Sequence, residues 1–336
     1  MQPQLIPENR TKWRFLAYDD GVGADQAEKQ GNLRLSKWPD AHALAAAMSR
    51  TYLVDERAAL TLWLALQLER PVLVEGPAGV GKTDLARAAA ETLGRPLVRL
   101  QCYEGLDESK ALYEWDYGKQ LLFSQLLRDT AAKATVGAKD LMEAARMLSA
   151  ASPAFFSREF LIARPLFHAI TSPDPVVLLV DEVDRGDPEL EALLLELLAE
   201  NQITIPELGT FKATEPPLVL LTTNGTRDMT DALRRRCLHL FMDYPEPSRE
   251  IAILELRVPG LDRALAQRIA EVVTKIRAMP LEKVPSIAET IDWARALLLL
   301  ARGTLDAKTA DETLGLLLKH EEDRAKVAAE LPKLLP

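Results

Sequence analysis

The chain contains very little cysteine and no excess of positive charge. Its two cysteines among 336 residues, Cys102 and Cys237, have no histidine or cysteine at metal-ligand spacing, so we expect neither a zinc site nor a structural disulfide. Lysine and arginine number 41 against 50 aspartates and glutamates, which gives a net charge of −9. Because a general nucleic-acid binder presents a basic face, we expect no nucleic-acid partner.

Long apolar runs are missing as well. Apolar runs such as Val176–Val180 and Ala296–Ala301 are far shorter than the roughly 20 residues that span a bilayer. The N-terminus shows no basic segment followed by an apolar one, as a signal peptide would. Apolar residues still make up 48% of the chain, the ordinary share for a folded domain. We therefore expect a globular, cytoplasmic protein without membrane insertion.

Strand and helix patterns alternate through most of the chain. Short Val/Leu-rich runs between helical patterns predict a parallel sheet covered on both faces, with strands at 71–75, 96–102, 176–181, 218–223 and 238–241. Strand patterns stop near Pro245, and helical patterns follow to the end. The sequence predicts an N-terminal extension over 1–38, an α/β domain over 39–244 and an all-α domain over 245–336.

A glycine-rich segment follows the first predicted strand and opens a helical pattern. It has the form G-x-x-x-x-G-K-S/T, in which backbone N–H groups and a helix N-terminus bind phosphate. Lys82 is predicted to reach the β- and γ-phosphates of ATP, and Thr83 to hold Mg²⁺. A chance glycine-rich turn is the alternative, but the strand–loop–helix context favours nucleotide binding. The predicted nucleotide contacts are Gly76, Pro77, Ala78, Gly79, Val80, Gly81, Lys82, Thr83 and Asp84, and Tyr52–Val54 is the candidate lining of a base pocket.

Two acidic residues end the strand predicted over 176–181. Asp181 is expected to hold Mg²⁺ through bound water, and Glu182 to orient and polarise the water that attacks ATP. A buried strand with two acids at its exposed end is the alternative. Because this strand follows a phosphate loop, we favour the catalytic interpretation.

Two further polar segments come later in the chain. Asn224 ends the strand predicted over 218–223 and is a candidate to lie between the γ-phosphate and the attacking water, although asparagine is also an ordinary turn residue. The arginines 234–236 follow, either as a solvated basic surface or as the source of an arginine that enters a neighbouring subunit's ATP site. Arg236 is our first choice and Arg234 the second, because side chains two apart on an extended segment share a direction.

These four segments, in this order, resemble those of the AAA+ ATPases. Several stretches are similar to the MoxR family, and in particular to its CoxD-type branch, which is associated with maturation of carbon monoxide dehydrogenase. They are Leu100–Tyr117, Phe160–Ile170, Asp181–Arg185 and Ala232–Cys237. The resemblance runs from about Leu44 to Leu300 and implies a five-stranded parallel sheet, a helical lid, and a homo-oligomeric ring, a hexamer, with ATP and Mg²⁺ between subunits.

The resemblance also implies a function. Members act as chaperones or remodellers of a client protein, which here would be a molybdoenzyme receiving its metal cofactor, with a von Willebrand factor A-domain protein as adaptor. Three other functions stay open: a P-loop kinase, a DNA-directed AAA+ motor, and a nucleotide switch without remodelling activity. Glu182 argues against the kinase and the net charge of −9 against the motor. In a nucleotide switch, Glu182→Gln would leave turnover unchanged.

Three local features complete the expectations. The resemblance implies a β-hairpin within 113–122, and alternation around a turn predicts another over Ile203–Phe211. Both hairpins face a pore or substrate, or they simply cover the core. The chain over 128–165, which includes a helical pattern at 139–148, exceeds what a minimal P-loop domain needs and is predicted to be an insertion. Lids of this family usually present an arginine to the γ-phosphate from the start of a helix, but Pro285–Glu289 has none and Arg295 lies nearly two turns further on.

Overall fold

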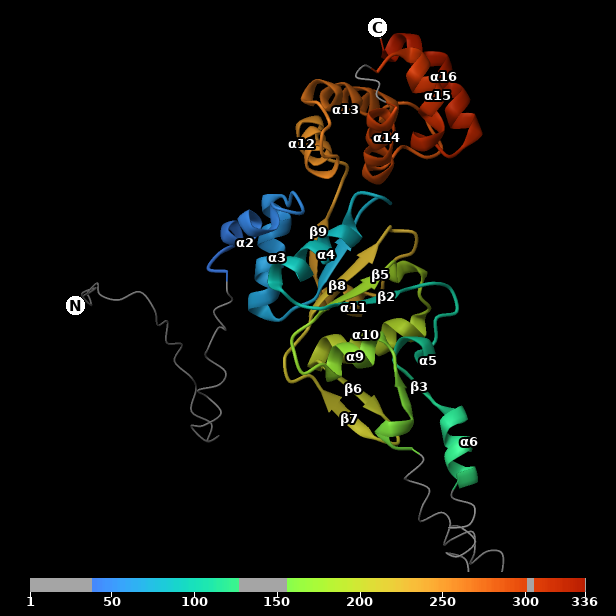
Figure 1. Ribbon diagram of the computed structural model, residues 1–336. Coiled ribbons are helices and arrows are strands. Elements are labelled where there is room, and N and C mark those ends of the chain that lie inside the picture. The colour runs from blue at the N-terminus through green and yellow to red at the C-terminus, as the bar shows by residue number, and fades with distance from the viewer. Residues whose placement is uncertain (1–37, 127–155, 301–304, 336) are drawn as a thin grey trace, which may run out of the picture. The chain divides into compact units, whose positions relative to one another are not determined.

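The computed structural model describes residues 38–126, 156–300 and 305–335 (Figure 1). The predicted extension, apart from Trp38, and the helical pattern at 139–148 lie outside these residues. All described residues belong to one contact unit that runs from Ser36 to Pro336.

A five-stranded parallel sheet forms the centre of the α/β region, in the order β2-β5-β8-β1-β9. The strands are β1 (Val72–Glu75), β2 (Leu97–Gln101), β5 (Val177–Asp181), β8 (Leu218–Thr223) and β9 (Leu238–Phe241). The five predicted strands and the α/β fold class are confirmed. β5 and β8 are buried along their whole length, which explains why their sequences are continuous apolar runs.

Helices cover both faces of this sheet because successive strand residues point to opposite sides. Val72 and Val74 pack in one core with α2 (Ala41–Met48), α3 (Glu56–Leu68) and α4 (Lys82–Leu93). Leu73 belongs to a second core, which α9 (Pro165–Thr171), α10 (Pro188–Glu200) and α11 (Asp231–Arg236) complete on the other face. Both cysteines are unpaired and buried, and burial raises the pKa of each thiol to about 12.

One predicted hairpin is wrong and the other is confirmed. After α5 (Glu108–Ala111), β3 (Tyr113–Trp115) leads directly into α6 (Tyr117–Leu126), so 113–122 does not fold back on itself. Asp116 explains the helix start, because its carboxylate accepts the Lys119 N–H over 2.8 Å.

The antiparallel partner of β3 lies near the end of the predicted insertion. β4 (Leu161–Ala163) pairs with it after the 3₁₀ turn η2 (Arg158–Phe160). By contrast, β6 (Gln202–Ile205) and β7 (Gly209–Lys212) form the predicted local hairpin, and the buried Ile203 and Ile205 anchor it to the core.

Five helices follow the sheet: α12 (Pro247–Arg257), α13 (Arg263–Arg277), α14 (Ile287–Leu299), α15 (Ala307–Leu317) and α16 (Glu321–Leu334). They share a core of their own, whose buried members all lie between Leu254 and Leu335. Trp293 is fully buried in it, and its indole N–H donates to the Thr313 hydroxyl over 2.8 Å. No helix within the described ranges is both long enough and apolar enough to cross a membrane.

Candidate ATP-hydrolysis site

The loop between β1 and α4 has a backbone that requires glycine. Gly79 and Gly81 have φ values of +76° and +98°, in the left-handed region that favours glycine. A Cβ on Gly76 would lie 1.9 Å from the Met242 carbonyl oxygen, and one on Gly79 would lie 2.2 Å from the Ser286 Cβ. The loop is therefore closely packed against the end of β9 and the start of α14.

Lys82 is held inside this loop. Its Nζ donates to the carbonyl oxygens of Gly76 and Pro77, both over 2.7 Å, and to Asn224 Oδ1 over 2.8 Å. Burial lowers the pKa of the ammonium group, and the carboxylates of Asp184, Asp181 and Glu182 oppose that shift. The structure thus brings the predicted lysine and the predicted asparagine into direct contact.

Thr83 and Asp181 also meet. The threonine hydroxyl donates to both carboxylate oxygens of Asp181, over 3.0 and 3.1 Å, and the Thr222 hydroxyl donates to Oδ1 over 2.6 Å. A hydroxyl and a carboxylate beside a phosphate loop are the hard oxygen donors that Mg²⁺ prefers. These residues fit the predicted magnesium site.

Glu182 turns its side chain beside this pair. Its φ of +56° lies in the left-handed region, which is unusual for a residue with a Cβ, and its N–H donates to the Thr222 hydroxyl over 2.9 Å. The carboxylate accepts from the Gln101 amide over 3.1 Å and lies 3.3 Å from Arg185 Nε. The Glu182 side chain is 32% exposed, so water can reach it.

Asp184 is a site residue that the sequence analysis missed. It is buried, and its Oδ2 accepts the backbone N–H groups of Asn224 and Thr226 and the Thr226 hydroxyl, over 3.2, 3.1 and 2.6 Å. Burial raises the pKa of this carboxyl, but the hydrogen bonds from Thr226 and Asn224 outweigh burial and lower the pKa overall. Asp184 therefore fixes the loop that carries Asn224, and its place two residues after Glu182 was the available signal.

Arg99 is the second missed residue. Its Nε and Nη2 donate to Asp181 Oδ2 over 3.1 and 2.6 Å, and it also donates to the Gln101 amide oxygen. In the β2–β5 register Gln101 lies opposite Asp181, and Arg99 is two residues earlier on the same face. That alternation was the only sequence signal for these contacts.

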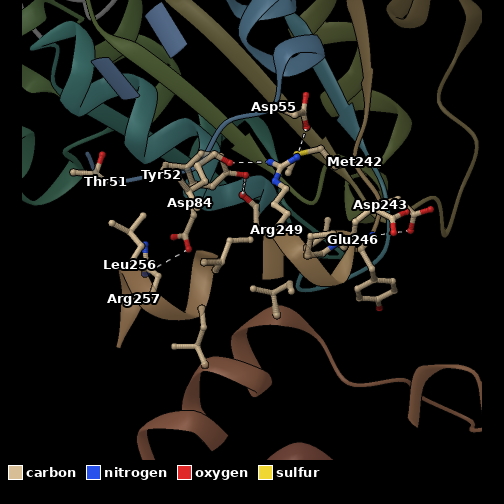
Figure 2. Close-up of a pocket in the computed structure, with 18 of the residues that line it drawn as sticks. Thr51, Tyr52, Asp55, Asp84, Met242, Asp243, Glu246, Arg249, Leu256 and Arg257 are labelled. Atoms are coloured by element: carbon tan, nitrogen blue, oxygen red, sulfur yellow. Dashed lines mark hydrogen bonds and ion pairs between the residues drawn. The ribbon is translucent and has the colours of Figure 1, made fainter. Parts of the chain in front are cut away.

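Two adjoining cavities open over the loop. One, of about 310 Å³, is lined by most of the predicted residues: Ala78, Gly79, Gly81, Lys82, Thr83, Asp84, Asp181, Glu182 and Asn224. The other, of about 270 Å³, is shown in Figure 2. The two share five lining residues: Gly81, Asp84, Arg257, Ile287 and Ile291. A polar cavity on a phosphate loop joined to a second cavity suits a nucleoside triphosphate.

The second cavity is lined by Val80 and, of the candidates Tyr52–Val54, by Tyr52 and Leu53 but not by Val54. Arg249 from α12 reaches across it, and its guanidinium donates to the Asp55 carboxylate over 3.0 Å and to the Leu53 carbonyl over 2.8 Å (Figure 2). The C-terminal helices and the segment before α3 therefore close this cavity together.

Two arginines of the C-terminal helices line the cavity of about 310 Å³. Arg295 does so from α14, although its sequence position gave little reason to expect it, and it pairs with Asp292 over 3.2 Å. Arg257, at the end of α12, was missed; its Nη2 lies 3.6 Å from Asp84 Oδ2 (Figure 2).

The three consecutive arginines lie on helix α11 and not on an extended segment. Our reason for choosing Arg236 and Arg234 as a pair is therefore wrong, because residues two apart on a helix are about 200° apart around its axis. Arg234 lies 3.6 Å from Glu75 at the end of its own β1, and Arg236 donates to the Ala232 carbonyl over 3.4 Å. Arg235 is exposed.

Four features define the class as a P-loop nucleoside triphosphatase domain. They are a phosphate loop, an adjacent hydroxyl–carboxylate pair, a water-accessible glutamate and a buried lysine–asparagine contact. Residues 71–237 match the family described as an AAA domain of the dynein-related subfamily. The α/β region is thus an AAA+ ATPase domain.

Curated relatives agree with this assignment. The gas vesicle ATPase GvpN of Haloferax mediterranei is 25% identical over 221 residues, which cover 63% of this chain and 58% of that protein. The NorQ protein of Paracoccus denitrificans is 24% identical over 216 residues, or 62% and 65% of the two chains. The chain thus spans about three fifths of the length of these relatives.

Among solved structures, a Thermotoga maritima RuvB mutant is similar with a TM-score of 0.44 and 17% identity, covering 78% of this chain and 68% of that one. That likeness is too loose to support an argument. The domain match is to an AAA domain, and the relative from Haloferax mediterranei is named an ATPase.

Proposed function

We propose that the whole protein is a MoxR-type AAA+ remodelling ATPase of the CoxD-type branch, which hydrolyses ATP at the interfaces of a ring of identical subunits. The contact between Gly79 and Ser286 carries this proposal, because it joins the phosphate loop directly to the N-cap residue of the C-terminal helix α14. A remodeller needs such a joint, since nucleotide chemistry must move a separate part of the chain.

The site residues take the following roles in ATP hydrolysis. Lys82 and the loop N–H groups bind the phosphates, and Glu182 orients and polarises the attacking water. Asn224, fixed by Asp184 and in contact with Lys82, positions that water beside the γ-phosphate. Thr83 and Asp181 hold Mg²⁺, which neutralises charge on the phosphate oxygens when bound.

The C-terminal helices act as a lid that follows the state of the nucleotide. The start of α14 is rigid, because Ser286 and Glu289 form a reciprocal capping box. Behind it, Arg277 donates to the Pro285 carbonyl over 2.8 Å and forms two hydrogen bonds with the buried Glu250, over 2.7 and 2.9 Å. A shift of the loop at Gly79 would therefore move α14 as a unit.

The client and the adaptor are proposed from the resemblance of 100–117 and 160–170 to the CoxD-type branch. The client is a molybdoenzyme that receives its metal cofactor, and the adaptor carries a von Willebrand factor A domain. The relative named a gas vesicle ATPase supports ATP hydrolysis but not this client. We propose a cytoplasmic hexamer, with no nucleic acid as partner.

The proposal is tested by measuring ATPase rate and particle size at increasing protein concentration. We expect free phosphate as product, ring particles in the presence of a non-hydrolysable ATP analogue, and a rate per subunit that rises with concentration to a plateau. Monomers with a constant rate per subunit, a phosphorylated acceptor, or turnover that depends on DNA would each contradict it.

A further inference from the structure

Asp181 is unusual in being paired with a cation that does not belong to the phosphate loop. Within the described part of the chain, three side chains donate to it: those of Thr83, Thr222 and Arg99. The two hydroxyls are neutral, and both reach Oδ1. Arg99 instead places two N–H groups on Oδ2, so among these three donors it is the one that brings a positive charge to the carboxylate that fits Mg²⁺.

We propose that Arg99 is a positioning residue that competes with Mg²⁺ for Oδ2 of Asp181. The inference rests on the proposed binding of ATP and Mg²⁺ at this site. A divalent cation close to Oδ2 and a guanidinium 2.6 Å from the same atom repel each other in a site where the carboxylate is only 4% exposed. Mg²⁺ therefore binds tightly only when nucleotide phosphates add ligands that compensate for the displaced arginine.

The surroundings of Arg99 allow this exchange. Its side chain is 41% exposed, so the guanidinium can leave Asp181 without becoming a buried unpaired charge. Gln101, two residues further along β2, already accepts a hydrogen bond from Arg99 and would remain a partner after the exchange. Thr83 and Thr222 also orient the Asp181 carboxylate, through hydrogen bonds that do not involve Arg99.

A purely structural role for Arg99 makes the opposite prediction. If the arginine mainly orients Asp181 for the metal, its loss will weaken Mg²⁺ binding. If it competes, its loss will strengthen Mg²⁺ binding. The sign of the change separates the two roles.

The test uses the full chain and a fluorescent ADP analogue, with binding followed by fluorescence as Mg²⁺ is titrated at fixed nucleotide. In Arg99→Met, which keeps the length of the side chain and removes its charge, we expect the Mg²⁺ concentration for half-maximal binding to fall three- to tenfold. ADP affinity in a chelator should stay within twofold of the unaltered chain. Arg99→Lys should restore most of the original midpoint, because it returns the charge. Arg87→Met, on an exposed part of α4, is the matched control.

An unchanged or higher midpoint in Arg99→Met, with an unchanged circular dichroism spectrum, would overturn the proposal. Because the readout is binding, a chain that binds nucleotide but neither forms rings nor turns over ATP would contradict the proposed function while leaving this inference intact. An unaltered chain whose ADP binding ignores Mg²⁺ would overturn this inference, whereas the proposed function is tested separately by ATPase rate and particle size.

Discussion

Lys82 and Asn224 are in contact although 142 residues separate them: the lysine Nζ donates to the asparagine Oδ1 over 2.8 Å. The contact joins the phosphate loop to the carboxyl end of β8, two strand ends that lie side by side because β1 and β8 pair in parallel. Substrate binding and positioning of the attacking water therefore depend on neighbouring but separable groups.

This separation predicts different effects for the two residues. Lys82→Ala should abolish nucleotide binding, because it removes the cation buried in the loop. Asn224→Ala should keep binding within a few-fold and lower the ATPase rate by about 10²-fold, as loss of one preorganised polar group typically does. Fluorescent-nucleotide titration and phosphate release distinguish the two. Lys212→Ala, at an exposed position, is the control, and full turnover by Lys82→Ala would refute the loop assignment.

Glu182→Gln should bind ATP normally and hydrolyse it roughly 10²- to 10⁴-fold more slowly, because an amide cannot polarise the attacking water. Glu189→Gln, an exposed change nearby on α10, should leave the rate unaltered. Single-turnover assays with labelled ATP measure the step directly. Wild-type turnover by Glu182→Gln would support a nucleotide switch that does not use this residue.

The lowered pKa of Asp184 leads us to predict that the stability of the protein depends on pH. Hydrogen bonds hold the pKa of its carboxyl below the usual value in the folded protein, so its ionised form stabilises the fold at neutral pH. That contribution is present above the ordinary aspartate pKa and is lost as pH falls through the lowered value.

Asp184→Asn should therefore lower the free energy of unfolding at pH 7 by about 2 kcal/mol, the range for hydrogen bonds to a charged group. The difference from the unaltered protein should shrink as the pH approaches 3. Urea unfolding at several pH values measures it. A difference that grows toward acid would contradict the assigned direction.

Two glycines predict a contrast in stability. Gly76→Ala should lower the free energy of unfolding by about 3 kcal/mol, because the new Cβ would meet the Met242 carbonyl 1.9 Å away. Gly94→Ala, at the end of α4, should cost about 1 kcal/mol, since its φ is +65° but no atom lies within 4 Å of the added Cβ. Equal costs at both positions, by thermal or urea unfolding, would show that the loop relaxes easily.

The sequence predicted what depends on local pattern. The five strands could be predicted because buried parallel strands are continuous apolar runs. The loop at 76–83 could be predicted because its glycines and lysine have fixed spacing. Contacts between segments far apart in the sequence could not be predicted. Arg99 meets Asp181 only through strand pairing, and Arg257 enters the site only through packing of the C-terminal helices.

The two wrong expectations have the same origin. Tyr113–Trp115 does form a strand, but its partner lies more than forty residues later, beyond α6, so no local rule could pair them. Arg234–Arg236 was predicted to be an extended segment between a short helix and a strand, but that helix, α11, continues through Arg236. In both cases the element was short, and tertiary contacts decided its conformation.

The central claim is that each ATP site is completed by an arginine from the neighbouring subunit. The most direct measurement mixes Arg236→Ala and Glu182→Gln subunits in equal amounts and follows phosphate release; Arg234→Ala and Arg235→Ala are tested in the same way. Arg236→Ala and Glu182→Gln should each bind ATP and be nearly inactive when present alone. At random assembly, about a quarter of the interfaces combine an intact Glu182 with an intact neighbouring arginine, so the mixture should recover about a quarter of the original rate. Mixed rings that form but stay as inactive as their parents, for all three arginines, would contradict the claim.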